Sequence, residues 1–324
     1  MARVHYFTRG GRNNSIPYMV PLFVLFDYLR YLLKIIFGGF DLIHVNVSLG
    51  KRNLIRDPFF VVAAKLLGKR VLLFIHGWDK NYENDSRGLR MFRRADSIIV
   101  LAREFKDKLE AMGYRGKINV ESTVVDQRFS DKFTIEEIDL KQKKKTANIL
   151  FLSRLEKEKG VYQILKAFEI INGELGHTKL LIAGTGPELE AVKKYVSARN
   201  LVHVDICGYV TGEKKIEIFK LADIYAFPTF YGEGMPISIL EAMTAGLPVI
   251  TRPVGGIRDF FEHDKMGFLT DSTNPEVIAG LMRHMVLNKE KCNAMARYNY
   301  EYARQHFIAP IIVERLEQIY AEVI

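Results

Sequence analysis

The sequence predicts an α/β protein that folds as two domains, each built around a parallel sheet. The chain has 324 residues, which is too long for one typical hydrophobic core and fits two domains of ordinary size. Continuous apolar runs alternate with helical segments, first as a strand at residues 41–47, a helix near 58–67 and a strand at 70–75. Strands that are apolar on both faces are typical of parallel sheets covered by helices. A second series of such units begins at residue 148.

Composition indicates a cytoplasmic globular protein. Hydrophobic residues make up 48% of the chain and charged residues 26%, the balance expected of domains with packed cores. The two cysteines, Cys207 and Cys292, lie far apart in the sequence, so we expect no disulfide framework and a reducing compartment. No stretch has the form of a cleavable signal peptide.

The net charge of +9 is concentrated in the first part of the chain. Residues 1–140 hold 23 Lys and Arg against 16 Asp and Glu, whereas residues 147–324 hold 20 against 22. A basic domain attracts anionic lipid headgroups, phosphorylated acceptors or nucleic acid. No helix-turn-helix, zinc-finger or aromatic RNA-binding motif accompanies the charge, so we expect no nucleic-acid partner.

The first 37 residues predict a strand at residues 3–8, a loop containing Gly10 and Gly11, and a long apolar helix over residues 16–37. Three charges argue against a membrane span, because each costs about 2.5–3.5 kcal/mol near the centre of an inserted helix. They are spaced i, i+3, i+7 on one narrow face of an amphipathic helix: Asp27, Arg30 and Lys34. This helix either packs in the core of the first domain or places part of its apolar face at a membrane interface, with Phe23, Phe26, Tyr31 and Phe37.

Polar side chains lie at the ends of two buried-type strands in this half. Asn46 is near the end of strand 41–47, and His76 directly follows strand 70–75. Ligands of parallel sheets bind beyond the carboxyl ends of the strands, so His76 has either a capping role or a role in a site. The charged stretch 130–146, which ends in a lysine run, predicts an interdomain linker.

The second domain begins with a strand followed by a cationic loop. Arg154 and Lys159 follow strand 148–153 and would neutralise a diphosphate, Arg as a planar fork and Lys as a point charge, with Lys157 as the alternative. Two further strands end in turns: one at Gly184, and one at residues whose backbone suits contact with a base edge, namely Gly208, Tyr209 and Val210.

Residues 227–250 are the most informative stretch of the chain, and they predict a strand, a Gly-rich loop, a helix and another strand. Pro236 suits the first helical position, and Gly246 followed by Pro248 is a helix-stop signal, so the helix covers roughly residues 236–245. The N-terminal amides of such a helix, preceded by flexible glycines, form a site for a phosphate or diphosphate.

Two carboxylates flank this anion site, Glu233 before the helix and Glu241 inside it. Carboxylates accept hydrogen bonds from vicinal hydroxyls, so one on each side of the amides indicates hydroxyl, diphosphate and hydroxyl, the layout of a nucleotide sugar. A lone Glu is more often a solvated surface residue, but the segment around Glu241 is too apolar for a solvated face.

The segment EGMPISILEAMTAGLPVI, with its Glu-x7-Glu spacing, resembles the signature of the family 4 retaining glycosyltransferases. The resemblance implies the GT-B fold, two Rossmann-like domains facing a cleft. It implies an N-terminal acceptor domain over residues 1–140, a linker over 141–147, a donor domain over 148–305 and a terminal helix over 306–324 that crosses back to the first domain. The segments DLIHVN and FIHG look like two successive strands of the family's first domain.

The resemblance also implies roles for individual residues. The residues expected at the reacting centre are His76, which would contact the donor sugar, with Glu233, Arg154 and Lys159. The residues expected to hold the nucleotide sugar, UDP- or GDP-linked, are Arg154, Lys159, Gly184, Gly208, Tyr209, Val210, Glu233, Gly234, Met235, Pro236 and Glu241. No cofactor and no metal are expected, because Arg154, Lys159 and the helix start would carry the charge of the leaving group.

Three functions are compatible with these residues. The first is a retaining transferase that acts on a lipid-linked or saccharide acceptor in bacterial surface-polysaccharide synthesis, in the cytoplasm or on the inner face of its membrane. The second is a nucleotide-sugar epimerase or hydrolase, and the third is a catalytically dead binding protein. The third depends on the N-terminus, where residues 3–8 are either the family's second strand, with the first strand-helix unit missing, or a compacted first strand.

Overall fold

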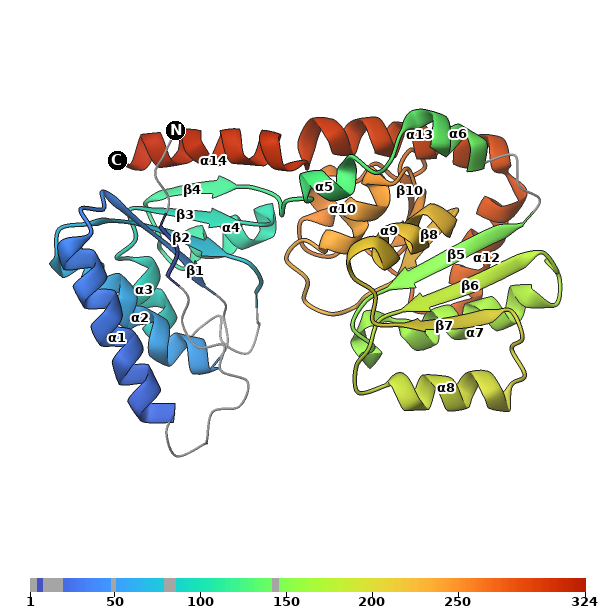
Figure 1. The fold of residues 1–324 in the computed structure, drawn as a ribbon, viewed down its shortest axis with the longest axis horizontal. Helices are drawn as coiled ribbons and strands as arrows, with labels where there is room; N and C mark the ends of the chain where they lie inside the picture. The colour runs from blue at the N-terminus through green and yellow to red at the C-terminus, as the bar shows by residue number, and fades with distance from the viewer. Residues whose placement is uncertain (1–4, 8–19, 48–50, 79–85, 142–145) are drawn as a thin grey trace. The chain divides into compact units, whose positions relative to one another are not determined.

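The computed structural model describes residues 5–7, 20–47, 51–78, 86–141 and 146–324. The chain divides into two compact units (Figure 1), one formed by Met1–Glu121 with Val313–Ile324 and the other by Ser122–Ile312. Each unit is built on its own parallel sheet, so the predicted α/β class is confirmed.

In the described part of unit 1, four strands form a sheet in the order β1-β2-β3-β4. All of its neighbouring strands are parallel, and the last residues of β1, β2, β3 and β4 are in register, so their carboxyl ends lie at one edge. The strands are β1 (Leu42–Val47), β2 (Arg70–Ile75), β3 (Ser97–Val100) and β4 (Lys117–Val120).

Among the described residues of unit 1, the helices before the C-terminal helix are α1 (Val20–Phe37), α2 (Lys51–Leu66), α3 (Ser86–Phe92) and α4 (Arg103–Ala111). The last helix of the chain, α14 (Ala309–Val323), belongs to this unit from Val313 onward. The core combines inward side chains of the sheet with residues of α1, α2, α3 and α4. None of the helices in the described part of the chain is long and apolar enough to cross a bilayer.

Two expectations for unit 1 need correction. The helix expected near residues 58–67 starts earlier, and Pro58 lies inside α2 rather than at its start. A proline inside a helix removes one hydrogen bond and usually marks a boundary, which explains the misplaced start. Of the strand expected at residues 3–8, only residues 5–7 are described, and they do not belong to a strand.

Unit 2 contains a six-stranded sheet in the order β10-β9-β8-β5-β6-β7, and all of its neighbouring strands are parallel. The chain runs outward from β5 to β7 and then returns to β8 on the other side of β5, which makes the β5/β8 boundary a topological switch point. The strands are β5 (Ala147–Leu152), β6 (Thr178–Ala183), β7 (Val204–Gly208), β8 (Ile224–Phe227), β9 (Val249–Thr251) and β10 (Gly267–Leu269).

Helices connect these strands as in Rossmann-like folds. Helix α12 packs against α7, and α10 packs against α13. The helices of unit 2 are α5 (Gln127–Ser130), α6 (Ile135–Lys141), η3 (Lys157–Lys159), α7 (Val161–Asn172), α8 (Leu189–Ala198), α9 (Gly212–Leu221), α10 (Ile237–Thr244), α11 (Ile257–Phe260), α12 (Pro275–Leu287) and α13 (Lys289–His306).

The stretch expected to be a linker is largely helical. Helix α6 buries Ile138 and packs against α13, and Lys141 donates hydrogen bonds to the carbonyls of Phe219 and Ala222 at the end of α9. Residues 122–141 therefore belong to unit 2, whereas the sequence suggested a boundary at 140–147. Charge suggested a solvated tether here, but one buried isoleucine and one well-placed lysine attach the segment to the unit. Residues 142–145 of the lysine run lie outside the described residues.

Candidate active site

The switch point of unit 2 places two loops with candidate site residues side by side. Parallel strands bring their carboxyl ends to one edge, and ligands of such sheets bind in the crevice where the strand order reverses. The loop after β5 carries Arg154 and Lys159, and the loop after β8 carries Glu233 and leads into α10. Because β5 and β8 are paired, these loops are neighbours.

Lys159 and Glu233 form an ion pair between the two loops. The Lys159 Nζ lies 2.5 Å from Glu233 Oε1, and only about a seventh of each side chain is exposed. The same ammonium group lies 4.1 Å from the centroid of the Tyr231 ring, and Thr229 Oγ1 also approaches the Glu233 carboxylate at 3.4 Å. Lysine has three donors, so this pair leaves capacity for a further anion.

Gly160 explains why the loop after β5 reaches this position. Its φ of +87° is in the left-handed region, and it ends η3 and precedes α7. A Cβ at this residue would lie 2.7 Å from the Pro228 carbonyl oxygen. Glycine therefore supplies both the backbone turn and the close approach of the two loops.

The other two cations of this loop are more exposed. Arg154 forms an ion pair with Glu156 at 3.1 Å, and more than two thirds of its side chain is exposed. The Lys157 Nζ is 4.0 Å from Glu188 Oε1 and its side chain is equally exposed. The structure thus distinguishes Lys159, which is held at the loop junction, from Lys157, the alternative that sequence left open.

The start of α10 lies on buried residues. The helix begins at Ile237, one residue later than expected, and Pro236 directly precedes its first turn. Gly234, Met235 and Pro236 are all buried. Gly256 donates a backbone hydrogen bond to the Gly234 carbonyl at 2.7 Å. This support fixes the direction in which the first amides of α10 point.

Glu241 is buried inside α10 and is paired with a lysine of α9. The Lys215 Nζ lies 2.5 Å from Glu241 Oε1. Burial raises the pKa of the Glu241 carboxyl, and the neighbouring Lys215 charge opposes this shift without cancelling it. Sequence reasoning missed Lys215, because its position follows from the packing of α9 against the sheet and carries no motif.

The remaining donor-site candidates lie at the same edge of the sheet. A Cβ on Gly184 would lie 1.9 Å from the Ser153 carbonyl oxygen, so this glycine allows the turns after β6 and β5 to touch. Gly208, at the end of β7, accepts a backbone hydrogen bond from Gly184 at 2.7 Å. The next residue, Tyr209, is largely exposed, and Val210 is half-buried.

In unit 1, His76 and Asn46 lie together at the carboxyl edge of the sheet. The His76 Nε2 and Asn46 Oδ1 share a hydrogen bond of 2.7 Å, and the His76 ring stacks on Phe74 at 4.2 Å. Desolvation lowers the pKa of His76, which favours the neutral ring. The two residues that sequence placed at strand ends are therefore direct partners.

A second histidine on the same sheet was not anticipated. His44 of β1 shares a hydrogen bond of 2.7 Å with Tyr320 Oη of α14. Burial, and then the charge of His76, lower the pKa of His44 to about 4. Its buried Nε2 has no hydrogen-bond partner among the described residues.

Comparison with known proteins decides the family. The family model for glycosyl transferases group 1 matches residues 132–302, more than half of the chain. The chain belongs to this family. The membership expected from the Glu-x7-Glu segment is confirmed, and the match covers the loops after β5 and β8 and both Lys–Glu pairs.

Two curated relatives of this glycosyltransferase-family chain show how similar it is to named enzymes. It is 28% identical to the amylovoran biosynthesis glycosyltransferase AmsK of Erwinia amylovora, over 67% of this chain and 55% of the relative. It is 29% identical to the GDP-mannose-dependent alpha-(1-6)-phosphatidylinositol monomannoside mannosyltransferase of Mycobacterium tuberculosis, over 48% and 42%. The chain spans about half the length of the first curated relatives that it matches.

Solved structures show the same fold. The crystal structure of Anabaena HepE in complex with UDP and glucose matches with a TM-score of 0.75 and 18% identity, over 97% of this chain and 85% of that chain. The expected GT-B fold, with two Rossmann-like units, is confirmed. The roles of the individual site residues stay predictions.

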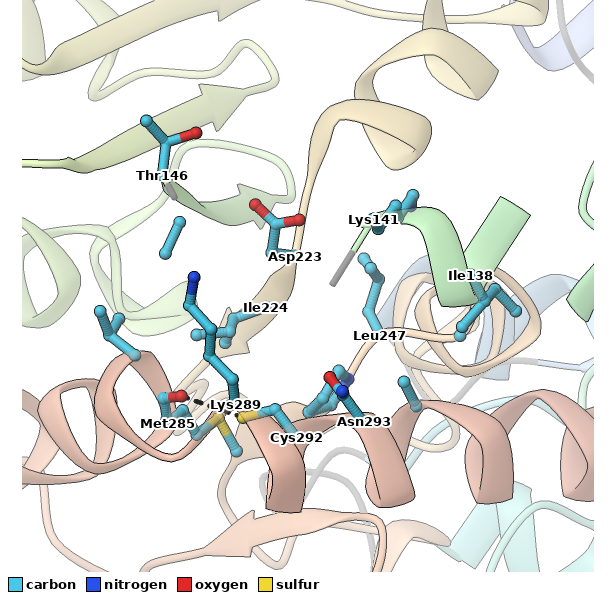
Figure 2. A pocket seen from close by; sticks show the side chains of 15 residues that line it. Ile138, Lys141, Thr146, Asp223, Ile224, Leu247, Met285, Lys289, Cys292 and Asn293 are labelled. Carbon is cyan, nitrogen blue, oxygen red and sulfur yellow. Dashed lines mark hydrogen bonds between the residues drawn. The ribbon is translucent and has the colours of Figure 1, made fainter. Parts of the chain in front are cut away.

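A cavity in unit 2 of this family member lies away from these loops. It has a volume of about 60 Å³, and Figure 2 shows it between α6, α12, α13 and the starts of β5 and β8. Cys292 Sγ contacts the Met285 carbonyl oxygen there at 3.1 Å, and burial raises the pKa of this thiol to about 12. The cavity is at the amino edge of the sheet and is too small for a nucleotide sugar.

Among the described residues, no cluster of His, Cys, Asp or Glu could hold a metal ion.

Proposed function

We propose that this protein is a retaining hexosyltransferase that moves a sugar from a nucleotide-sugar donor to a lipid-linked or saccharide acceptor in cell-surface polysaccharide synthesis. The observation that supports it best is the presence of two Lys–Glu contacts, Lys159 with Glu233 at the switch point and Lys215 with Glu241 between α9 and α10. Together they place cations and hydroxyl acceptors along α10, one pair before the helix and one pair at a residue inside it.

The diphosphate of the donor binds at the loop after β5 and the start of α10. Lys159 and Arg154 supply positive charge, and the first amides of α10 supply donors aligned with the helix dipole. These groups are charged or fixed before the donor binds, so they stabilise the nucleoside diphosphate as it leaves. No metal is needed in this scheme.

The two glutamates bind the hydroxyl groups on either side of the diphosphate. Glu241 is held by Lys215 in a buried environment that suits the ribose, and Glu233 is held by Lys159 close to the leaving phosphate. The exposed Tyr209 and the backbone at Gly208 and Val210 contact the base. The donor is UDP- or GDP-linked, since HepE was crystallised with UDP and the mycobacterial relative is named as GDP-mannose-dependent.

In the reaction, the bond between the anomeric carbon and the phosphate oxygen breaks, and a bond from an acceptor hydroxyl oxygen to the same face of that carbon forms. The acceptor proton passes to the departing phosphate oxygen, so no protein general base is assigned. His76 contacts the donor sugar, and Asn46 holds its ring in place. The acceptor binds to unit 1, and the enzyme works at the inner face of the cytoplasmic membrane.

Donor binding and chemistry are tested separately. In a thermal-shift screen of UDP-, GDP- and ADP-sugars, one base should stabilise the protein, because a ligand at 100 times its Kd adds about 2.7 kcal/mol. No stabilisation by any of them contradicts the proposal. Transfer to a lipid-linked acceptor is then followed with EDTA present, and the anomeric configuration of the product is determined by NMR. Epimerised or merely hydrolysed donor would instead support the two alternative enzymes, and binding without turnover would support the binding protein.

A further inference from the structure

Helix α1 of unit 1 presents an apolar face to solvent. Seven large hydrophobic side chains on it are at least half exposed, for example Leu25 at 55%, Leu29 at 51% and Leu33 at 57%. The full set is Leu22, Leu25, Phe26, Leu29, Leu33, Ile36 and Phe37. Their spacing of three and four residues places them on one continuous stripe, hereafter the α1 stripe.

The opposite face of α1 is fixed in the core. Asp27, Tyr31 and Ile35 are buried, and Tyr31 Oη donates a hydrogen bond to the Phe60 carbonyl oxygen at 2.8 Å. Helix α1 therefore carries apolar side chains on two faces: Tyr31, Ile35 and the partly buried Leu32 pack in the core, and the α1 stripe faces solvent. These anchors prevent a rotation that would hide the stripe.

Cations and an aromatic residue border the stripe. At roughly 100° per residue, Arg30 and Lys34 fall between the buried and the exposed faces of the helix. Lys34 Nζ donates to the Tyr6 carbonyl oxygen at 2.6 Å, and the Tyr6 side chain is 87% exposed. The Arg30 guanidinium lies 5.6 Å from the Phe26 ring centroid. Arg, Lys and Tyr beside an apolar surface are the side chains that lie at the level of lipid headgroups.

The net charge of unit 1 distinguishes between the possible partners of the α1 stripe. The sequence of unit 1 holds 22 Lys and Arg against 14 Asp and Glu, a net charge of +8, whereas unit 2 holds 25 against 24. Docking of a second copy on the stripe would bring two units of +8 together, whereas an anionic lipid surface is attracted to the same field. We propose that the α1 stripe is the surface by which this protein docks on an anionic membrane, with α1 lying in the plane of the interface.

This assignment deepens the proposed function, because it brings the acceptor unit to the membrane that holds a lipid-linked acceptor. At 18 residues, α1 is about 27 Å long, and it lies flat with one face in the lipid rather than crossing it. Exposed leucines elsewhere, such as Leu140, Leu221 and Leu287, come from three different helices of unit 2. Such scattered residues are ordinary surface features and offer a matched control.

Vesicle co-sedimentation of the full chain tests the assignment. The vesicles contain phosphatidylcholine alone or with 30% phosphatidylglycerol, at low and high NaCl. Wild type should bind the anionic vesicles at least tenfold better, and the triple variant Leu25→Gln, Leu29→Gln, Leu33→Gln should lose this binding. The control variant Leu140→Gln, Leu221→Gln, Leu287→Gln, with side chains of similar exposure, should bind as wild type does. Arg30→Gln with Lys34→Gln should reduce the dependence on salt.

A fluorescence measurement tests directly whether α1 enters the lipid. Trp78 is the only tryptophan of the chain and is buried, so Phe26→Trp adds a reporter on the stripe. Its emission should shift to the blue with anionic vesicles and be quenched by brominated lipids, whereas Trp78 of the wild type should respond to neither. Circular dichroism and nucleotide-dependent thermal shifts establish that each variant is folded and binds donor, so loss of docking is distinguished from failure of the proposed function.

Three results overturn the proposal. One is a lack of anionic-vesicle binding by the wild type, and another is equal binding by the stripe variant. The third is a concentration-dependent dimer, seen by analytical ultracentrifugation, that the stripe variant abolishes while vesicle binding is unchanged, because the stripe is then a self-association surface.

Discussion

The two units of this protein differ in where their polar chemistry lies. Unit 2 is nearly neutral, and its site cations are paired with buried or half-buried carboxylates at one sheet edge. Unit 1 carries a net charge of +8, has a histidine and an asparagine at the corresponding edge of its sheet, and exposes an apolar helix.

Under the proposed function, the two units have different tasks. A nucleotide diphosphate is the same in many donors, so the residues proposed to hold it would follow a recurrent pattern, and the family match lies in that part of the chain, at residues 132–302. An acceptor and a membrane surface are recognised by overall charge and exposed area, which many sequences provide equally well. Variants in each unit should therefore fail in different assays.

The largest expected effect is in unit 1. Replacement His76→Ala should lower sugar transfer by about 10²–10³-fold, as removal of one positioned polar group at a reacting centre does, and leave nucleotide binding unchanged. Asn46→Ala should give a smaller loss, because it frees the ring without removing it. Steady-state transfer and UDP or GDP titration measure the two properties, and weakened nucleotide binding in His76→Ala would mean that the roles of the units are misassigned.

The next effect is in unit 2. Lys159→Ala should weaken binding of the nucleoside diphosphate by about 1.5–3 kcal/mol, the range for a hydrogen bond to a charged group. Lys157→Ala is the matched control on the same loop and should change binding little, because its side chain is exposed and its nearest carboxylate is 4.0 Å away. Calorimetry of both variants checks this, and equal losses would remove the distinction between the two lysines.

A third effect concerns the pH dependence of unit 1. His44 has a folded-state pKa of about 4, below its unfolded value near 6.5, so the unfolded chain binds more protons between these values. The contribution of neutral His44 to the free energy of unfolding should be fully present above pH 6.5. It should decrease as the pH falls toward 4, by about 2 kcal/mol at pH 5. Urea titrations followed by Trp78 fluorescence measure it, and His44→Gln should show a flatter pH dependence. An unchanged slope in that variant would show that another group is responsible.

The smallest effect is again in unit 2. Gly160→Ala should destabilise the unit by about 1–2 kcal/mol, because an L-residue is strained in the left-handed region and its Cβ meets the Pro228 carbonyl. Gly173→Ala, at the other end of α7, has a negative φ and open space at its Cβ, so it should be neutral. Thermal unfolding of the two variants makes the comparison, and a neutral Gly160→Ala would contradict the close approach of the two loops.

Much of unit 2 could be predicted because its signals are local. The Gly-rich loop, the helix stop at Gly246 and the Glu-x7-Glu spacing each lie within a few residues of one another. Helix α10 begins within one residue of the expected position. The ion-pair partners of the charged side chains could not be predicted in this way. Lys159 was expected at the diphosphate and Glu233 at a hydroxyl, yet the two bind each other, and Lys215 was missed because its carboxylate partner is 26 residues away in the sequence.

By itself, the sequence determined the α/β class and the family, and it supplied the candidate donor-site residues, because these depend on residue type and short-range spacing. Only the tertiary structure decided which charges neutralise each other and which face of α1 meets solvent. An amphipathic pattern defines two faces, but it does not say which one the core takes. In α1 the anchors Tyr31 and Ile35 settle that choice, and they leave a row of leucines outside.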